Sequence, residues 1–336
     1  MPTLRDVARL AGVSTATVSA TLSGAAFVSE ALQARVREAV DRLGYSPHGI
    51  ARSLKSGSSR LVGLVIPDVT NPFFTNLVHG VEQLTRQDGY SMLLCDTGFD
   101  VAREREMLSL MRMQRVDGIV LCPAGDIQDY REVFAIGRGT PIVLVDSAPL
   151  GASVDCVVID NFAAAFEATS HLIDLGHRHI AAVAGPRQGL SSIERTRGFL
   201  AALEARGVPL RPDNIVHADF HEEGAYDAVA ALIERPQRAT ALFVANNQML
   251  VGVMRRLHDA GLSVPQDISV AAIDDFPWAS AFRPALTTMR QPVEELAAQA
   301  VERLRARMAG DVSDPRRIEL AANLIVRDSV ARIASG

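Results

Sequence analysis

The chain has 336 residues, a formal net charge of −5 and 48% hydrophobic side chains, which suits a small domain joined to a larger core and excludes a single short module. Its three cysteines lack paired spacing and its apolar runs fall far short of the roughly 20 residues of a membrane span, so we expect a soluble cytoplasmic protein with no disulfide, thiolate metal site or membrane contact. Residues 1–60 carry eight basic and four acidic side chains. The other 276 residues carry 26 basic and 35 acidic side chains. Phosphate groups of a partner would therefore be attracted to the amino-terminal end and repelled by the rest of the chain.

Residues 4–22 predict two short helices separated by a tight glycine break, which is typical of a helix-turn-helix. Ser14 stands where its hydroxyl can cap the second helix. Val7, Leu10 and Val18 are expected to pack the two helices against each other. The second helix then presents small and polar side chains to a DNA groove, namely Thr15, Ala16, Thr17, Ser19 and Ala20. An ordinary helical hairpin is the alternative.

A third helix is predicted from Ser29, as its cap, to the terminating Gly44. Its apolar face is expected to cover the first two helices and consists of Leu32, Val36, Val40 and Leu43. These three helices predict a domain over residues 1–46. Residues 47–59 predict a very short helix on a Gly/Ser linker, from the helical spacing of Ile50, Ala51 and Leu54. So short a helix needs a partner to form, and a flexible tether is the alternative.

From residue 61 onward, short runs of Val, Ile and Leu alternate with longer helical patterns, which predicts parallel sheets covered by helices. The expected strands are Leu61–Ile66, Ser91–Cys95, Gly118–Cys122, Ile142–Val145, Val157–Ile159, Ile180–Val183, Ala241–Val244 and Ser269–Ile273. Because this number of strands would make an unusually wide single sheet, we predict two α/β lobes, with a boundary near residues 158–161.

Two of the chain's motifs are Gly63-Leu-Val-Ile-Pro-Asp-Val-Thr-Asn-Pro-Phe-Phe74 and Pro284-Ala-Leu-Thr-Thr-Met-Arg-Gln-Pro292, and further ones lie at residues 3–22, 44–54, 115–119, 171–180 and 264–269. Together, in this order, they closely resemble the LacI family of bacterial transcription regulators, over essentially the whole chain. The resemblance implies a helix-turn-helix domain, a hinge helix and a core over residues 60–336 similar to periplasmic sugar-binding proteins. Its implied segments are about 60–158 and 290–320 for lobe 1, and about 159–289 and 321–336 for lobe 2.

The resemblance also implies how the chain meets double-stranded operator DNA. The second helix would enter the major groove, with Thr15, Ala16 and Ala20 at base edges and with phosphate contacts from Ser14, Thr17 and Ser19. Leu54 would act as a wedge in the minor groove. The other implied DNA contacts are Thr3, Leu4, Ser29, Tyr45, Ile50, Ala51 and Arg52. Ala20 departs from the large side chain common in the family, and since a methyl group cannot pair with guanine, the operator sequence cannot be copied from relatives.

A small-molecule effector is implied between the two lobes. Its implied shell consists of Asp68, Asn71, Phe73, Phe74, Asp146, Arg195, Phe220, Asn246 and Asp274. Carboxylates and amides pair with hydroxyl groups and phenylalanine faces stack on a ring, so a sugar or sugar derivative fits, with a nucleoside or a sugar acid as alternatives. Structural alternatives exist for each residue, such as a turn after a strand or, for Arg195, a surface ion pair. Asn247 departs from the Asp usual in the family.

An α/β enzyme is the competing class, but the sequence lacks a phosphate-binding loop, a dinucleotide-binding glycine motif, a nucleophile elbow and a His-Glu-x-x-His motif. His177 and His179 are interpreted as surface side chains rather than metal ligands. We therefore expect no catalytic residue, metal or cofactor. The predicted function is an effector-controlled, homodimeric repressor of a carbohydrate operon, with an activator as the alternative and the direction of the effector's action left open.

Overall fold

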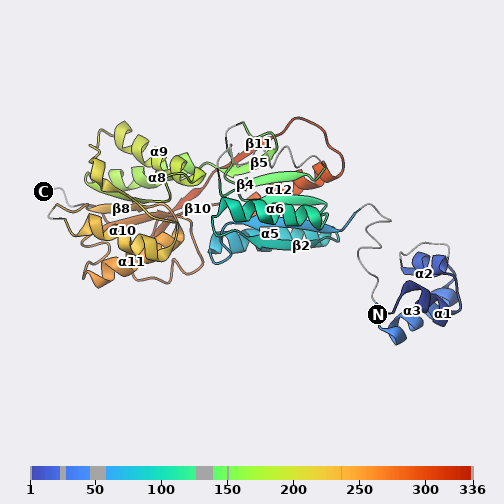
Figure 1. Cartoon of the computed structure of the whole chain (residues 1–336). Coiled ribbons are helices and arrows are strands. Elements are labelled where there is room, and N and C mark those ends of the chain that lie inside the picture. The colour runs from blue at the N-terminus through green and yellow to red at the C-terminus, as the bar shows by residue number, and fades with distance from the viewer. Residues whose placement is uncertain are drawn as a thin grey trace. The chain divides into compact units, whose positions relative to one another are not determined.

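The computed structural model describes residues 2–22, 28–45, 58–125, 139–149, 151–235 and 237–333. The chain divides into two compact units, Met1–Ser59 and Arg60–Gly336, which we call the small domain and the core (Figure 1). The predicted hinge residues lie outside the described part of the chain, namely Ile50, Ala51, Arg52 and Leu54. Across the described residues, no helix combines the length and apolar character that crossing a membrane requires.

The described part of the small domain contains α1 (Leu4–Ala11), α2 (Thr15–Leu22) and α3 (Glu30–Leu43). A capping box starts α1: the N–H of Thr3 donates to the Asp6 carboxylate at 2.9 Å, and the N–H of Asp6 donates to the Thr3 hydroxyl at 3.4 Å. Gly12 ends this helix in the left-handed conformation, at φ 62°. The hydroxyl of Ser14 accepts the N–H of Thr17 at 3.1 Å and so caps α2, as predicted.

The apolar core of the small domain contains Val7, Val18 and Val36, which are fully buried. Ala8, Ala11, Ala39 and Tyr45 are the other buried members of this cluster. The predicted packing role of Leu10 is wrong, because its side chain is 42% exposed. The inner face of α1 takes positions 7, 8 and 11, and position 10 falls outside that face of the helix. Small alanines therefore replace the expected leucine at the helix contact.

Lobe 1 of the core is a parallel sheet with the strand order β11-β5-β4-β3-β1-β2 in the described residues. Its strands are β1 (Leu61–Ile66), β2 (Ser91–Asp96), β3 (Gly118–Leu121), β4 (Ile142–Asp146), β5 (Asp155–Ile159) and β11 (Arg317–Leu320). Helices α5 (Pro72–Gln87) and α12 (Val293–Met308) pack on one face, and α6 (Val101–Met113) packs on the other. Both faces are thus covered, which explains why the central strands are continuous apolar runs.

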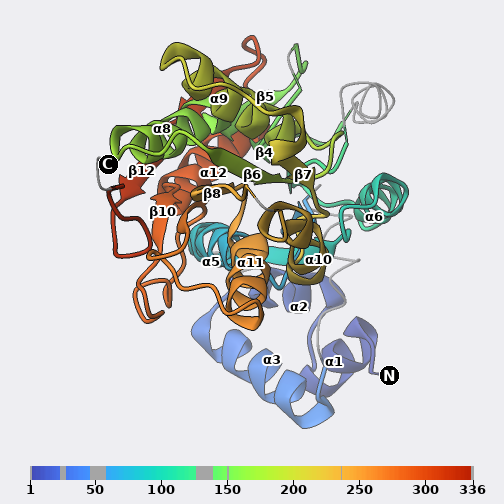
Figure 2. The same cartoon turned by 90° about the vertical axis from the view of Figure 1, so that its left-hand side faces the viewer.

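Lobe 2 has the strand order β12-β10-β9-β8-β6-β7, and β12 alone runs antiparallel to its neighbour in the described sheet. Its strands are β6 (Ile180–Ala184), β7 (Ile215–His217), β8 (Ala241–Val244), β9 (Ser269–Ile273), β10 (Thr287–Arg290) and β12 (Asn323–Ile325). Figure 2 shows one pair of helices on each side of this sheet. The pairs are α8 (Asn161–Asp174) with α9 (Leu190–Ala205), and α10 (Glu222–Ile233) with α11 (Asn247–Asp259), and the short 3-10 helix Pro212–Asn214 precedes β7.

The described chain passes between the lobes after β5, after β10 and again between β11 and β12. The carboxyl ends of β1 and β4 in lobe 1, and of β8 and β9 in lobe 2, lead into residues that line a common pocket. Open parallel sheets bind ligands at the carboxyl ends of their strands. The topology therefore brings the binding edges of two sheets together.

The strands that sequence analysis did not predict are β7, β10, β11 and β12. Three of them lie at sheet edges, and β10 is rich in threonine, so none contains the apolar run of a central strand. His177 is likewise not at the surface as predicted. It is buried, with Nδ1 2.9 Å from the Thr240 hydroxyl and Nε2 3.0 Å from the Ala331 carbonyl oxygen, and it ties the carboxyl-terminal segment to lobe 2.

Close packing between α8 and α9 depends on Gly198. A Cβ atom at this position would lie 2.2 Å from the backbone oxygen of Phe162. We expect Gly198→Ala to lower the free energy of unfolding of the core by about 1–3 kcal/mol, as overpacked positions do. Urea-induced unfolding measures the loss. Glu204→Ala, at an exposed position of the same helix, is the control, and equal stability of the two variants would contradict the packing argument.

Candidate functional site

Eight of the nine residues predicted to bind an effector line one pocket between the lobes. They are Asn71, Phe73, Phe74, Asp146, Arg195, Phe220, Asn246 and Asp274. Asp68, the ninth, lies beside this pocket, where its carboxylate accepts the N–H of Thr70 at 2.8 Å and the side-chain amide of Gln248 at 2.7 Å. Sequence analysis missed other lining residues: Pro67, Phe99, Pro123, Ala124, Ser147, Gly189, Leu190 and Ser191.

Unfavourable backbone conformations gather at this pocket. Phe99, Asp146, Phe220 and Asp274 have φ values of 59°, 72°, 70° and 72°, in the left-handed region that suits glycine. Such conformations cost roughly 1–3 kcal/mol each and persist where the surrounding structure enforces them, often at ligand sites. Their location at the carboxyl ends of strands and in the adjoining loops turns these side chains into the space between the lobes. The strain supports a binding role for this pocket.

Arg195, on α9, is the central cation of the pocket, and only 4% of it is exposed. Its Nε donates to the Asn161 side-chain oxygen at 2.7 Å, and one terminal nitrogen donates to the Ala245 carbonyl oxygen at 2.6 Å. The same nitrogen lies 3.8 Å from a carboxylate oxygen of Asp274. The expected alternative of a surface ion pair is therefore wrong. A buried guanidinium must be paired and hydrogen-bonded, and these contacts fix its orientation.

Two buried carboxyl groups face this single cation. Burial raises the pKa of Asp146 to about 7, although Arg195 favours its ionised form, and the Asp274 charge adds to the rise. Burial also raises the pKa of Asp274, against the opposing effects of Arg195, of the Gln291 side chain and of the Asn247 N–H. One oxygen of Asp146 is buried without a hydrogen-bond partner among the described residues. The pocket thus offers a carboxyl group that can donate or accept near neutral pH.

Aromatic rings line the apolar part of the pocket. The rings of Phe73 and Phe74 meet edge to face with centroids 5.0 Å apart, and both belong to the first turn of α5, which Asn71 caps through a 2.9 Å bond from the Phe73 N–H. Phe99 of lobe 1 lies against Phe220 of lobe 2, with centroids 5.4 Å apart. Polar groups beside aromatic faces are suited to a ring that carries hydroxyl groups.

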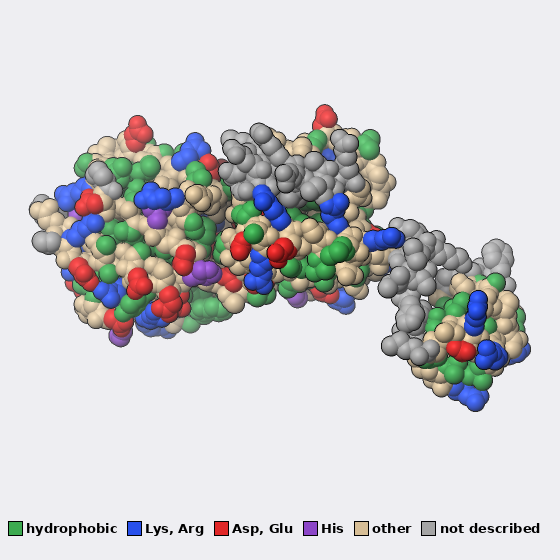
Figure 3. Space-filling view, in the orientation of Figure 1, with side chains coloured by type: hydrophobic (Ala, Val, Ile, Leu, Met, Phe, Trp, Pro, Cys, Tyr) green, Lys and Arg blue, Asp and Glu red, His purple; other side chains and the backbone are tan. Residues whose placement is uncertain are grey.

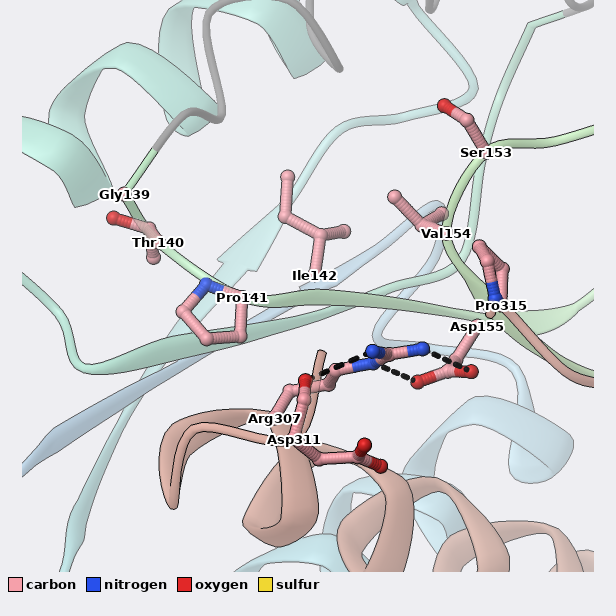
Figure 4. Close-up of a pocket in the computed structure, with 10 residues that line it drawn as sticks. All are labelled: Gly139, Thr140, Pro141, Ile142, Ser153, Val154, Asp155, Arg307, Asp311 and Pro315. Carbon is pink, nitrogen blue, oxygen red and sulfur yellow. Dashed lines mark hydrogen bonds and ion pairs between the residues drawn. The ribbon is translucent and has the colours of Figure 1, made fainter. Parts of the chain in front are cut away.

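A second pocket lies at the opposite, amino-terminal edge of the lobe 1 sheet, and none of the predicted site residues lines it (Figure 4). Arg307 donates to both carboxylate oxygens of Asp155, at 2.7 and 3.2 Å, and Arg303 donates to the same group at 3.1 Å. Burial opposes ionisation of Asp155, yet hydrogen bonds from Arg307, from the Arg316 N–H and from Arg303 hold its pKa below the usual range. We interpret this network as structural, because its charged side chains form hydrogen bonds with one another.

Of the predicted DNA-contacting residues that the structure describes in the small domain, all but one are exposed or half-buried. Ser14, Thr15 and Ala16 are exposed in the first turn of α2, as are Thr3 and Ser29 at the starts of α1 and α3; half-buried are Leu4, Thr17, Ser19 and Ala20. Tyr45 instead packs in the apolar core with 9% exposed. The DNA contact of Tyr45 stays a prediction.

Basic side chains predominate on the face of the small domain seen in Figure 3. One of the domain's arginines has a structural role that sequence analysis missed. Arg35 of α3 donates to the carbonyl oxygens of Ala11 and Gly12, at 2.6 and 3.4 Å. It thereby satisfies acceptors at the end of α1 and holds the turn that sets the direction of α2. The sequence signal was only a basic residue on an exposed helix position.

The comparisons with known proteins agree with this arrangement. The model for bacterial regulatory proteins of the lacI family matches residues 3–48, and the model for a periplasmic binding protein-like domain matches residues 169–330. The ribose operon repressor of Escherichia coli (strain K12) is 38% identical over 329 residues, which cover 98% of this chain and 100% of that protein. The chain belongs to the LacI family of bacterial regulatory proteins.

Other members of the LacI family match at similar length. The HTH-type transcriptional repressor PurR of Vibrio vulnificus (strain CMCP6) is 36% identical over 333 residues, covering 99% of this chain and 100% of that protein. The crystal structure of the lac repressor dimer bound to operator and the anti-inducer ONPF aligns with a TM-score of 0.88 and 27% identity, covering 98% and 99% of the two chains. The family consists of DNA-binding regulators, so the predicted regulator class, and not the enzyme class, is confirmed.

The raised pKa of Asp146 has a measurable consequence for stability. Because the folded-state pKa, about 7, exceeds the ordinary value of 3.8, protonation stabilises the fold below pH 4, and this contribution is lost as the pH rises from 4 through 7. We expect Asp146→Asn to make the free energy of unfolding fall less steeply over that window, with the remaining slope partly due to Asp274. Unfolding titrations at several pH values measure this. An unchanged slope would show that Asp146 titrates normally.

Proposed function

We propose that this LacI-family member is a cytoplasmic repressor of a carbohydrate operon, and that a small molecule bound between its core lobes controls its affinity for operator DNA. The observation that carries the proposal is the pocket itself, where two carboxyl groups, one buried arginine and several aromatic rings converge from both lobes. The name of the ribose operon repressor, which is similar over its whole length, supports a sugar-linked role.

The charge balance of the pocket favours a neutral polyhydroxylated ligand. Arg195 already faces the two carboxyl groups of Asp146 and Asp274, so an acidic ligand would add a third acidic group beside the one arginine that lines the pocket. Hydroxyl groups can instead donate to the carboxylates and accept from the guanidinium. We therefore propose a sugar before a sugar acid. A nucleoside is the second candidate, since Phe73 and Phe74 offer aromatic rings to a planar base.

Operator binding is proposed to involve two copies of the chain. A single short reading helix covers one half-site, so a symmetric dimer on a two-fold related operator provides the affinity. The lac repressor dimer, which is similar over 98% of this chain, supports that assembly. An effector can shift operator affinity only by binding two lobe arrangements unequally, and couplings of this kind amount to about 1–3 kcal/mol.

A substitution in the first turn of α2 tests the DNA contact. Ala16→Asp places a carboxylate near the phosphates and should abolish specific operator binding, while an acidic residue at a helix start stabilises the helix by about 0.3–1 kcal/mol. Loss of binding could then not be assigned to unfolding. Selection from random duplexes followed by gel-shift titration measures it. Ala34→Asp, at an exposed position of α3, is the matched control, and tight binding by Ala16→Asp would overturn the placement.

Arg195→Ala tests the effector pocket. The variant should bind operator but lose the effector's influence on it, which in coupled sites is commonly about 5–150-fold. A thermal-shift screen of monosaccharides, nucleosides and sugar acids identifies the effector first, because a bound ligand raises the melting temperature. Operator titrations with and without that ligand then measure the response. Arg197→Ala, an exposed arginine of the same helix that pairs with Glu194, should respond normally. A full response in Arg195→Ala would remove this residue from the site.

A further inference from the structure

A line of direct contacts joins the lobes beside the pocket. We call it the seam, and its members are Asp68, Thr70, Asn71 and Phe99 in lobe 1, and Phe220, His221, Asn247 and Gln248 in lobe 2. Each of its cross-lobe contacts links two protein groups and requires no ligand atom. The seam is therefore a property of the chain itself.

Gln248 occupies the middle of the seam. Its amide nitrogen donates to the Asp68 carboxylate at 2.7 Å and to the Thr70 hydroxyl at 3.1 Å, both across the lobe boundary. Its carbonyl oxygen lies 3.4 Å from Nδ1 of His221, in its own lobe. The other carboxylate oxygen of Asp68 accepts from the N–H and hydroxyl of Thr70, which orients the group. Hydrogen bonds to charged groups contribute more than neutral ones, so the contact with Asp68 is the strong one.

Asn247 adds a second, neutral contact. Its side-chain nitrogen donates to the Asn71 oxygen at 3.0 Å, and both residues are buried. Asn71 also caps α5, and the N–H of Asn247 interacts with Asp274 of the pocket. An aspartate at position 247 would have no proton to donate at neutral pH. The amide therefore suits this chain's seam and connects it to the pocket.

The aromatic contact closes the seam on the side of the pocket. Phe99 lies 5.4 Å from the ring of Phe220 and 5.8 Å from that of His221, measured between centroids. Phe99 and Phe220 also line the pocket, so a change in lobe separation at the seam moves its walls.

We propose that Gln248 is a positioning residue: its hydrogen bond to Asp68 holds the lobes together at the seam and so sets how far the effector pocket is open. The effect on the effector rests on the proposed function, whereas the effect on lobe separation does not. Gln248 itself does not line the pocket. Its influence passes through α11 and its neighbour Asn247, whose backbone meets Asp274.

The chain contains its own reporter of the seam. Trp278 is its single tryptophan, it is 50% exposed, and it lines one groove together with Thr70 and Pro72 of lobe 1 and Gln248 of lobe 2. Opening the seam removes the lobe 1 side of that groove. Quenching of Trp278 fluorescence by acrylamide should then increase and its emission maximum should shift to the red.

Reversal of the hydrogen-bond polarity tests the proposal. Gln248→Glu sets a carboxylate against Asp68, so at pH 7 the full-length chain should show stronger quenching and faster hydrogen exchange at the amides of Thr70 and Phe73. Adding Asp68→Asn to this variant should restore both signals, because the new amide at position 68 donates to the new carboxylate while its oxygen still accepts from Thr70. A merely structural role of Gln248 would not be rescued by this second change.

Gln266→Glu, at an exposed position of lobe 2, carries the same charge change and should leave both signals at the wild-type level. Sedimentation at the same concentration separates lobe opening from dissociation of subunits. Unchanged quenching and exchange in Gln248→Glu, or failure of Asp68→Asn to restore them, would overturn the proposal. If the wild-type chain binds no duplex and no sugar, the proposed function fails instead, and the fluorescence result still decides the role of Gln248.

Discussion

The core is organised around one buried cation. The guanidinium of Arg195 is buried, and a buried guanidinium is tolerated only where hydrogen-bond acceptors surround it. Those acceptors come from separate parts of lobe 2: Asn161 at the first crossing, the Ala245 carbonyl after β8, and Asp274 after β9. Ala245 and Asp274 directly follow their strands, and Asn161 is the first residue of α8, two residues after β5 ends. The position of the arginine therefore requires that the strand order, the crossing and the start of α9 all be correct.

The same electrostatic requirement links the two lobes. Asp146 enters the pocket from lobe 1, and its charge is disfavoured by burial and by Asp274, while Arg195 favours it. A ligand that donates hydroxyl groups to Asp146 would stabilise its ionised form and at the same time bind the arginine in the other lobe. Binding energy is then largest when the lobes are close. This gives a physical basis for a ligand that prefers one lobe arrangement, which is the condition for control at a distance.

Much of the fold could be predicted from the sequence, because buried central strands appear as apolar runs and helix ends as caps, as with Ser14. The strands alone did not indicate the effector pocket: Asp146 and Asp274 were implied by the resemblance to the LacI family. Edge strands such as β11 were not predicted, because a half-exposed strand contains no continuous apolar run. Phe99 was not predicted as a pocket residue, because the sequence does not show that an aromatic residue in a loop will meet a ring of the opposite lobe. The packing role of Leu10 was misassigned and the burial of Tyr45 was not predicted, since burial in so small a domain depends on three-dimensional packing that periodicity does not specify.

Magnitudes explain why a seam beside the pocket matters for regulation. A coupling between effector and operator amounts to about 1–3 kcal/mol, and one hydrogen bond to a charged group contributes about 1.5–3 kcal/mol. The contact between Gln248 and Asp68 is therefore as large as the whole signal that the effector is expected to send. If the contacts of the seam were strong, they would hold the lobes closed whether or not a ligand binds. If they were weak, the lobes would close only when a ligand binds. Substitutions along the seam could then change the response of the protein without altering any residue that touches the effector or the DNA.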